Sequence, residues 1–372
     1  MDDPEPSPDP SPRRYLALGP LARALGLAGD ARKLILATLG LLALGAGWAG
    51  LDRAFGDAAG PPPIRVRLGL AMDDFPGPGT NAPVQAALHV AEPARVVVGP
   101  VAALFDRGTT FRAWSRSALM ALWAVAVWGV AGGAIARVAV VQATTGGRVG
   151  LGTAARFAFR RAFPLIGAPL TPLLVAALFA IGCAGFGLVL RVPGGVGSTV
   201  AVIFGFLPLL AALVMALILG GLAVGWPLMI ATVAAEGEDA PDALSRSYSY
   251  VNQRLVKTLV HVAAAWAIGA AGLIAATLLA RVVLALAAWG VGLGAPAQSD
   301  ADATFAGWAG LVGLLVHAWV YAYFWSAAAI LYLILRRDVD GTDWHDVYLP
   351  EQDADTFAPE PPAAAAVEAE AG

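Results

Sequence analysis

Two long runs of sequence contain no charged residue, and they limit what this chain can fold into. They extend from Val192 to Ala235 and from Thr258 to Ala280. A helix crosses a bilayer with about 20 apolar residues, and a charge at mid-depth costs roughly 2.5–3.5 kcal/mol. Only 14% of the 372 residues are charged, whereas about 25% is usual in soluble domains. We therefore predict an all-α fold, a polytopic transmembrane helical bundle.

The apolar runs predict six membrane spans. In chain order these are 34–51, 117–140, 162–190, 200–233, 258–288 and 303–335. The last five form a membrane domain over 117–350, and 52–116 is expected to be an extracytoplasmic loop. Within that loop, residues 83–105 predict short amphipathic helices on the membrane surface, because Pro93 and Pro100 interrupt the segment.

The segments outside the spans differ in composition. Residues 1–12 are acidic and proline-rich, and 351–372 are acidic and rich in alanine and proline, so both are expected to be disordered. Residues 13–33 are basic, and Leu18, Leu21 and Leu25 have the spacing of one stripe of an interfacial helix.

Lysine and arginine predict the orientation. They gather before the first span, between the second and third, between the fourth and fifth, and after the sixth. Such residues favour the cytoplasmic side when loops are short. We expect a multi-pass protein of the bacterial inner membrane with both termini in the cytoplasm.

The polar stretch 236–257, EGEDAPDALSRSYSYVNQRLVK, predicts an amphipathic elbow helix before the fifth span. Pro241 and Asp242 suggest its start, with Asp242 as the N-cap. One face would point to the membrane and the other to water. The membrane-facing stripe is Leu244, Tyr248, Val251 and Leu255, and the opposite face is Ser245, Arg246, Ser249 and Asn252.

A weaker copy of this elbow lies at 150–164, GLGTAARFAFRRAFP, with Thr153 as its cap. Two span–elbow–span units could be an internal duplication or a convergent solution to one physical constraint. The interfacial residues of both elbows are topology anchors or contacts to lipid headgroups. These residues are Arg156, Arg160, Arg161, Arg246, Tyr248, Arg254 and Lys257.

Other polar and small residues lie within or beside the spans. His317, near the middle of the sixth, is a candidate functional group or a neutral imidazole that is hydrogen-bonded to a neighbouring backbone carbonyl or hydroxyl. Arg281 and His261 are expected at the interfaces, and Cys183 as a packing residue. Gly129 and Gly133 form a GxxxG motif that would admit another helix, or they only reflect how common glycine is in a chain with 43 glycines. Four residues predict a break or kink in the fourth span, as in some transporters: Gly220, Gly221, Gly225 and Pro227.

The functional classes can be narrowed by what the sequence lacks. It has no GxSxG, HExxH or P-loop motif, no basic nucleic-acid tract and no clustered histidines. We expect no enzyme activity, cofactor, metal or nucleic-acid partner. A non-enzymatic membrane module that organises lipid or partner proteins is favoured, with membrane lipids, other membrane proteins or a second copy as partners. The alternative is a transporter or permease for a lipid or an uncharged small solute.

Three sequence runs resemble an uncharacterised family of bacterial integral membrane proteins typical of planctomycetes. They are WGVAGGAIARVAVVQATTGGRVGLGTAARFAFRRAFPLIGAP, VGWPLMIATVAAEGEDAPDALSRSYSYVNQR and FWSAAAILYLILRRDVDGTDWHDVYLPE. The resemblance covers roughly 114–351 and implies no chemical activity. The elbow DALSRSY is also loosely similar to the membrane domain attached to some glycerophosphodiester phosphodiesterases. That enzyme activity does not carry over, because the phosphodiesterase domain has no counterpart here.

Overall fold

The computed structural model describes residues 18–348, apart from 57–59, 61, 65–71, 78, 107, 194 and 295–300. The side chains of Leu18, Asp73 and 301–306 are also outside the description. The disorder predicted for 1–12 and 351–372 therefore falls on residues outside this set. Within the described residues the chain is all-α, as predicted.

Among the described residues, six helices are long and apolar enough to cross a membrane, in agreement with the predicted number. They are α2 (Ala31–Phe55), α5 (Phe111–Thr145), α7 (Ala162–Val189), α9 (Phe206–Glu236), α11 (Leu255–Gly294) and α12 (Ala301–Asp340). The shorter helices are α1 (Leu18–Ala28), η3 (Met72–Asp74), α3 (Ala82–Val90), α4 (Glu92–Ala103), α6 (Leu151–Arg160), α8 (Val196–Phe204) and α10 (Ala240–Gln253).

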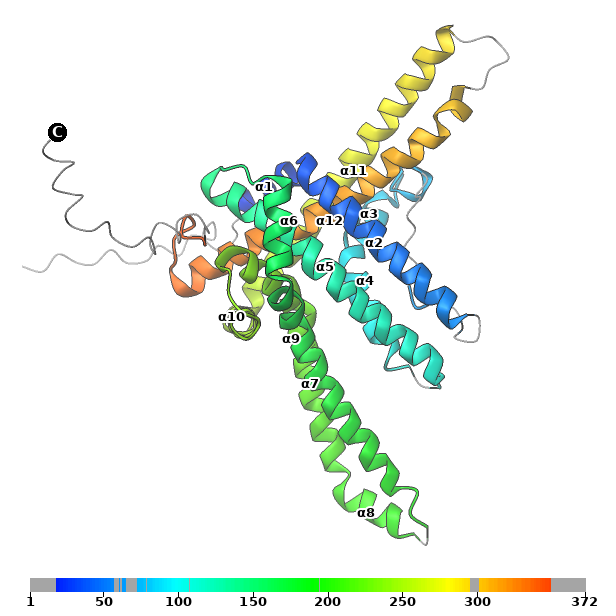
Figure 1. Cartoon of the computed structure of the whole chain (residues 1–372), viewed down its shortest axis with the longest axis vertical. Helices are drawn as coiled ribbons and strands as arrows, with labels where there is room; N and C mark the ends of the chain where they lie inside the picture. The colour runs from blue at the N-terminus through cyan, green and yellow to red at the C-terminus, as the bar shows by residue number, and fades with distance from the viewer. Residues whose placement is uncertain are drawn as a thin grey trace, which may run out of the picture.

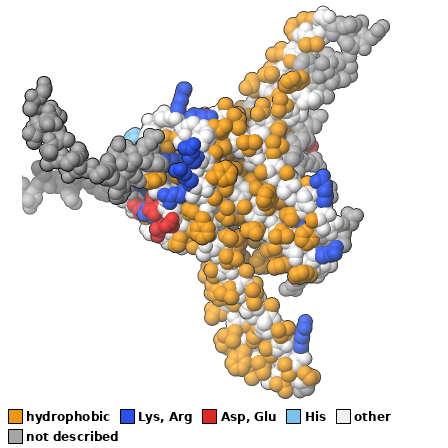
Figure 2. Space-filling model, viewed as in Figure 1, with side chains coloured by type: hydrophobic (Ala, Val, Ile, Leu, Met, Phe, Trp, Pro, Cys, Tyr) orange, Lys and Arg blue, Asp and Glu red, His pale blue; other side chains and the backbone are white. Residues whose placement is uncertain are grey.

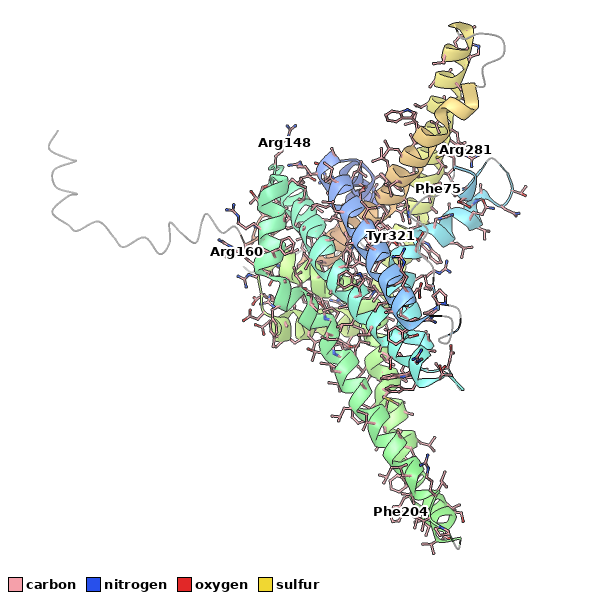
Figure 3. The ribbon with its side chains drawn as sticks, turned by 45° about the vertical axis from the view of Figure 1, so that its right-hand side comes forward. Phe75, Arg148, Arg160, Phe204, Arg281 and Tyr321 are labelled. Atoms are coloured by element: carbon pink, nitrogen blue, oxygen red, sulfur yellow. The ribbon has the colours of Figure 1, made fainter. Side chains whose placement is uncertain are left out.

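Helix α12 is the centre of the molecule, and it contacts α1, α2, α5, α9 and α11. Three helix pairs diverge from this centre, namely α2 with α5, α7 with α9, and α11 with the first half of α12 (Figure 1). We call these pairs the arms. The α7–α9 arm ends at α8, and Phe204 lies at its tip (Figure 3). Its outer side chains, such as Leu178 and Leu209, are exposed.

Charge and apolar surface are separated along the molecule. Figure 2 shows acidic and basic side chains gathered at one end, with a few more basic side chains near the far ends of the arms, while hydrophobic side chains cover most of the arms. The charged end carries α6, α10 and residues 336–348, and we call it the elbow end. A continuous apolar surface is suited to contact with lipid tails, because water would make it costly to expose.

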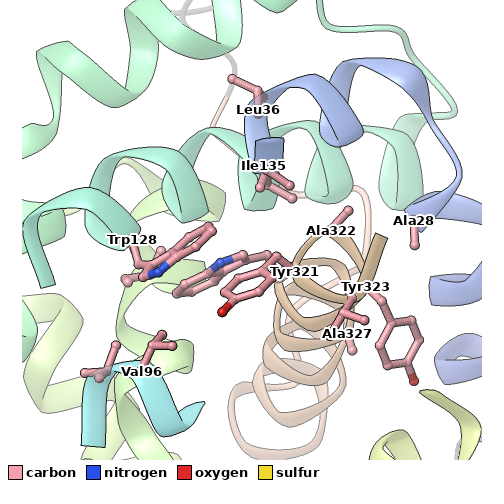
Figure 4. Close-up of a cluster of buried hydrophobic side chains, with 14 of the residues drawn as sticks. Ala28, Leu36, Val96, Trp128, Ile135, Tyr321, Ala322, Tyr323 and Ala327 are labelled. Atoms are coloured by element: carbon pink, nitrogen blue, oxygen red, sulfur yellow. The ribbon is translucent and has the colours of Figure 1, made fainter. Parts of the chain in front are cut away.

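Aromatic rings fill the core between α5, α9 and α12 (Figure 4). Trp128 stacks on Tyr321 with ring centroids 4.4 Å apart, and Trp226 meets Trp325 edge-on at 5.2 Å. Gly132 admits Trp325, because a Cβ at this glycine would lie 2.3 Å from the indole Cε2 atom. Glycine thus lets two spans approach within one side-chain thickness.

The GxxxG motif of α5 has the packing role that was predicted for it. A Cβ at Gly133 would lie 2.6 Å from the Leu165 side chain of α7, and one at Gly129 would lie 3.1 Å from the Leu165 carbonyl oxygen. Both glycines are buried.

Helices α3 and α4 form a hairpin that packs into the bundle rather than on a surface. Ala86 and Val96 are fully buried, and the indole N–H of Trp266 in α11 donates to the Ala87 carbonyl at 2.7 Å. The sequence prediction treated Pro93 as an interruption. It lies instead in the first turn of α4, where a missing N–H costs nothing.

The fourth span differs from its prediction. Helix α9 is continuous from Phe206 to Glu236 and includes Gly220, Gly221, Gly225 and Pro227, while the interruption lies at Gly205, between α8 and α9. Gly221 serves packing, because a Cβ there would lie 2.3 Å from the Tyr248 ring. The predicted break was therefore wrong, because a small residue that admits a neighbouring ring was interpreted as a helix breaker.

Gly132→Ala should destabilise the fold by about 1–3 kcal/mol, since the added methyl group would overpack a core in which Trp325 has no room to move. Thermal unfolding of the purified protein in one detergent would measure the effect. Gly182→Ala in α7 is the control, because a Cβ there has no atom within 4 Å. Equal unfolding midpoints for the two variants would contradict this description of the α5–α12 contact.

Candidate functional site

A local change of direction creates the ionic cluster at the elbow end. Gly237 has φ +67°, a left-handed conformation that ends α9 and that glycine adopts without strain. After this turn α10 begins at Ala240, with Asp239 at its N-cap position. The predicted N-cap was Asp242, which instead lies in the first turn. Pro241 is compatible with this earlier start, because the first helical turn tolerates proline.

Glu236, the last residue of α9, is the centre of the cluster. One carboxylate oxygen accepts a hydrogen bond from Arg246 of α10 at 2.5 Å, and the other forms an ion pair with Arg336 of α12, 3.0 Å from its Nε atom. The Tyr332 hydroxyl also donates to Glu236. Only 9% of the carboxylate side chain is exposed, so these bonds join three helices where water is largely excluded.

A second carboxylate of the cluster, Asp338 of α12, pairs with cations at the start of α11. Asp338 lies 3.1 Å from the Arg254 Nε atom and 2.5 Å from the Lys257 ammonium group. The Tyr250 hydroxyl of α10 donates to Asp340. Burial and this carboxylate raise the pKa of Tyr250 above its usual value, so the hydroxyl stays a donor.

Arg137 of α5 extends the cluster toward the other elbow helix. It is buried and donates to the Ala234 carbonyl at 2.9 Å. Its guanidinium lies over the Phe157 ring of α6 at 4.9 Å and near the Tyr348 ring at 5.9 Å, within the range of a cation–π interaction. Arg161 also approaches Tyr348, at 5.8 Å.

The structure places most of the predicted interfacial cations in contact with protein groups. Arg246, Arg254 and Lys257 pair with carboxylates of α9, α12 or the intervening turn. Arg161 lies 3.9 Å from Asp239. Arg156 and Arg160 are exposed on α6, and Arg160 lies at the elbow end in Figure 3.

The orientation of α10 differs from the predicted stripe. Ala243, Ser247 and Tyr250 face the bundle together with Val251, whereas Leu244 and Tyr248 are only partly buried and Leu255 is exposed. Ser247 Oγ lies 3.4 Å from Thr232 Oγ1. Small side chains form the contact because α10 packs closely against α9, a tertiary constraint that hydrophobicity alone cannot reveal.

Tyr248 is held by α9. Its hydroxyl donates to the Ile218 carbonyl at 2.7 Å, and its ring covers Gly221. Burial raises the pKa of Tyr248. In the other elbow helix, α6, the N-cap is Gly150 rather than the predicted Thr153.

His317 is 1% exposed and its Nε2 atom lies 2.9 Å from a Glu92 oxygen of α4. The sequence prediction did not identify this carboxylate, because residues 83–105 were placed on the membrane surface. Although burial opposes it, the hydrogen bond with His317 and the nearby His89 ring lower the pKa of Glu92 to about 2. The one sequence signal for this carboxylate was its position three residues after His89, in a segment that otherwise consists mostly of small and apolar residues.

Three other predicted positions are resolved by the structure. His261 is fully buried within the protein, with Nδ1 2.7 Å from the Lys257 carbonyl oxygen. Arg281 donates to the backbone carbonyls of Met72 and Phe75. Figure 3 shows Arg281 beside Phe75. Cys183 is half-buried and approaches the Pro208 carbonyl at 3.8 Å.

Two apolar cavities flank Trp226 of α9. The first, of about 280 Å³, lies between α9, α11, α12 and the α3–α4 hairpin. The second, of about 190 Å³, lies between α4, α5, α7 and α9. Ala223 and Trp226 line both cavities. The wall of the first also includes Val90, Pro227, Val262, Trp266, Phe324 and Leu331. Such a surface offers dispersion contacts and few polar bonds, which suits a hydrocarbon chain.

The fold and these sites define a multi-pass helical membrane protein, with an ionic cluster at one end and apolar cavities between its spans. Comparison with known proteins found no family model, no curated protein and no solved structure that matches the chain.

Glu236→Gln should destabilise the protein by about 3 kcal/mol, because it removes the buried counter-charge of Arg336 and leaves the exposed Asp346 carboxylate, 3.6 Å from its Nη2 atom, as the neighbouring negative charge. Thermal or denaturant unfolding would measure the loss. Glu238→Gln removes a carboxylate that is 30% exposed and pairs with Arg246 alone, and it should cost no more than about 1 kcal/mol. Similar losses in the two variants would disprove the central position of Glu236.

Proposed function

We propose that this chain is a non-enzymatic membrane module that binds lipid between its helices and so organises the lipid around it. The observation that carries the proposal is the pair of apolar cavities on either side of Trp226. Their walls contain aromatic and aliphatic side chains, many of them from the long helices that form the arms. The occupant we favour is the acyl chain of a phospholipid.

The charged residues support a lipid partner as well. Arg156 and Arg160 are exposed on α6, whereas the elbow cations of α10 and α11 are paired with carboxylates. A cation near an anionic surface contributes about 1 kcal/mol to membrane binding. Of the predicted headgroup contacts, Arg156 and Arg160 are the best suited. Other membrane proteins or a second copy are further partners within the same proposal.

We also propose the bacterial inner membrane as the location, with the elbow end and both termini in the cytoplasm. The distribution of lysine and arginine supports this orientation. Membership of the planctomycete-type membrane protein family is proposed on the three sequence runs quoted above.

A permease for a lipid or an uncharged small solute is the second candidate. The observation that favours it is the Glu92–His317 pair inside the bundle, because ionisable groups among spans mark many transport pathways. Uptake by proteoliposomes would separate it from the lipid-organising module, which predicts lipid retention without solute movement.

Ala223→Trp should reduce the amount of phospholipid that remains with the protein after purification, because a bulky indole at a position that lines both cavities would take up space there. Native mass spectrometry would count the bound lipids. Ala177→Trp is the matched control, since Ala177 is exposed on α7 and lines neither cavity. Equal lipid retention in the two folded variants would refute the lipid-binding proposal.

The orientation predicts the results of reporter fusions. A fusion after Arg337 should be active as a cytoplasmic reporter, and a fusion near Gly79 should be active as an external one. The reason is that one predicted span precedes Gly79 and all six predicted spans precede Arg337, so an N-terminus in the cytoplasm puts the two positions on opposite sides of the membrane. A cytoplasmic signal at Gly79 would rule out the proposed topology.

A further inference from the structure

Three ionisable side chains meet where the α3–α4 hairpin contacts α12. Glu92 lies between His317, at 2.9 Å from Nε2, and His89, whose Nδ1 atom is 3.9 Å from the other carboxylate oxygen. The Tyr321 hydroxyl approaches Glu92 at 3.4 Å. Neither the ionic cluster of the elbow end nor the apolar cavities account for these groups.

The geometry determines which nitrogen of His317 carries its proton. Nε2 faces the carboxylate at hydrogen-bond distance, so the neutral ring must be protonated there to donate. The other nitrogen, Nδ1, is buried without a hydrogen-bond partner among the described residues. Nδ1 is therefore the nitrogen that can accept a further proton, while Nε2 on the same ring is hydrogen-bonded to the negatively charged carboxylate.

The negative charge of Glu92 favours the binding of a proton to the neighbouring imidazole. Glu92 is 21% exposed, and a partly buried anion is stabilised when its neighbour becomes a cation. One proton on His317 Nδ1 changes the site from a carboxylate with a neutral imidazole to an ion pair. No covalent bond breaks, and the net charge of the Glu92–His317 pair rises from −1 to 0.

His89 connects this pair to the outside of the bundle. Its Nε2 atom lies 2.9 Å from the Asp74 carbonyl oxygen, and its ring stacks on Phe75 with centroids 5.4 Å apart. The side chain is 21% exposed, so it can exchange protons with solvent. The interaction with Glu92, opposed by burial, raises the pKa of His89.

Other charged groups around the site point elsewhere. On α11, Arg281 is turned to the carbonyls of Met72 and Phe75. Arg23 of α1 is exposed, and Lys33 is near Asp30 at the start of α2. Asp74 belongs to η3 and faces His89 through its carbonyl oxygen.

We propose that Glu92, His89 and His317 form a proton-binding site that fastens the α3–α4 hairpin to α12. Protonation strengthens the contact between Glu92 and His317, and proton loss leaves a buried charge with hydrogen bonds alone. The hairpin should therefore be held more firmly at mildly acidic pH than at alkaline pH. The proposal does not depend on lipid binding, although the hairpin that the site fastens also forms part of the wall of both cavities.

The full-length protein in phospholipid nanodiscs allows a direct test, because the chain has four histidines. Selective ¹³C labelling of histidine gives ring signals that single His→Gln variants assign. We expect the His317 and His89 signals to titrate together. In Glu92→Gln their midpoints should fall by at least one pH unit, a tenfold loss of proton affinity. His345, which is exposed, is the internal control and should not change.

Hydrogen–deuterium exchange of residues 82–103 tests the mechanical part, after correction for the intrinsic effect of pH. In the wild type, protection of the hairpin should decrease as pH rises through the His317 midpoint. In His317→Gln this pH dependence should disappear, while protection of α10 stays as in the wild type. Tyr321→Phe keeps both the carboxylate and the imidazole, and should retain the dependence if Glu92→Gln fails to fold. Unchanged midpoints in Glu92→Gln, or protection that is independent of pH in the wild type, would overturn the proposal.

Discussion

The buried carboxylate of Glu236 determines how the helices of the elbow end can be arranged. A charge with so little exposure needs counter-charges from whatever surrounds it, and here these come from α10 and α12. Because Glu236 is also the last residue of α9, the bonds fix where this span ends. Helix α10 is then held against α9, and α12 is drawn into the centre, where α2, α5 and α11 pack around it.

The long helices could be predicted from the sequence, whereas several contacts between them could not. Apolar runs predicted all six long helices, because span length and exclusion of charge are set by the bilayer alone. The predicted membrane-facing stripe of α10 was wrong, because the helix packs closely against the bundle through the small residues Ala243 and Ser247. The role of Gly221 was misread for a related reason, since the side chain it admits, Tyr248, lies 27 positions later in the sequence.

The candidate sites show the same limit. Lysine and arginine were recognised as boundary residues, but their partners Glu236 and Asp338 were not, although all of these residues lie near span ends. His317 was identified as an unusual polar group, and only the folded hairpin brings Glu92 to it. A pair separated by 225 positions in sequence leaves no periodic signal, so pairings of this kind required the three-dimensional structure.

The divergence of the arms has a consequence for the surrounding bilayer. Helix α11 contains 40 residues and is therefore about 60 Å long, twice the thickness of a typical hydrocarbon core. Such a helix cannot stand upright with its whole apolar length in lipid. It must cross obliquely, thicken the membrane locally or extend beyond the hydrocarbon core, and each response carries an energetic cost. A protein with three arms of different inclination would thus impose a hydrophobic mismatch that varies around its perimeter and would favour lipids of different chain length on its different sides.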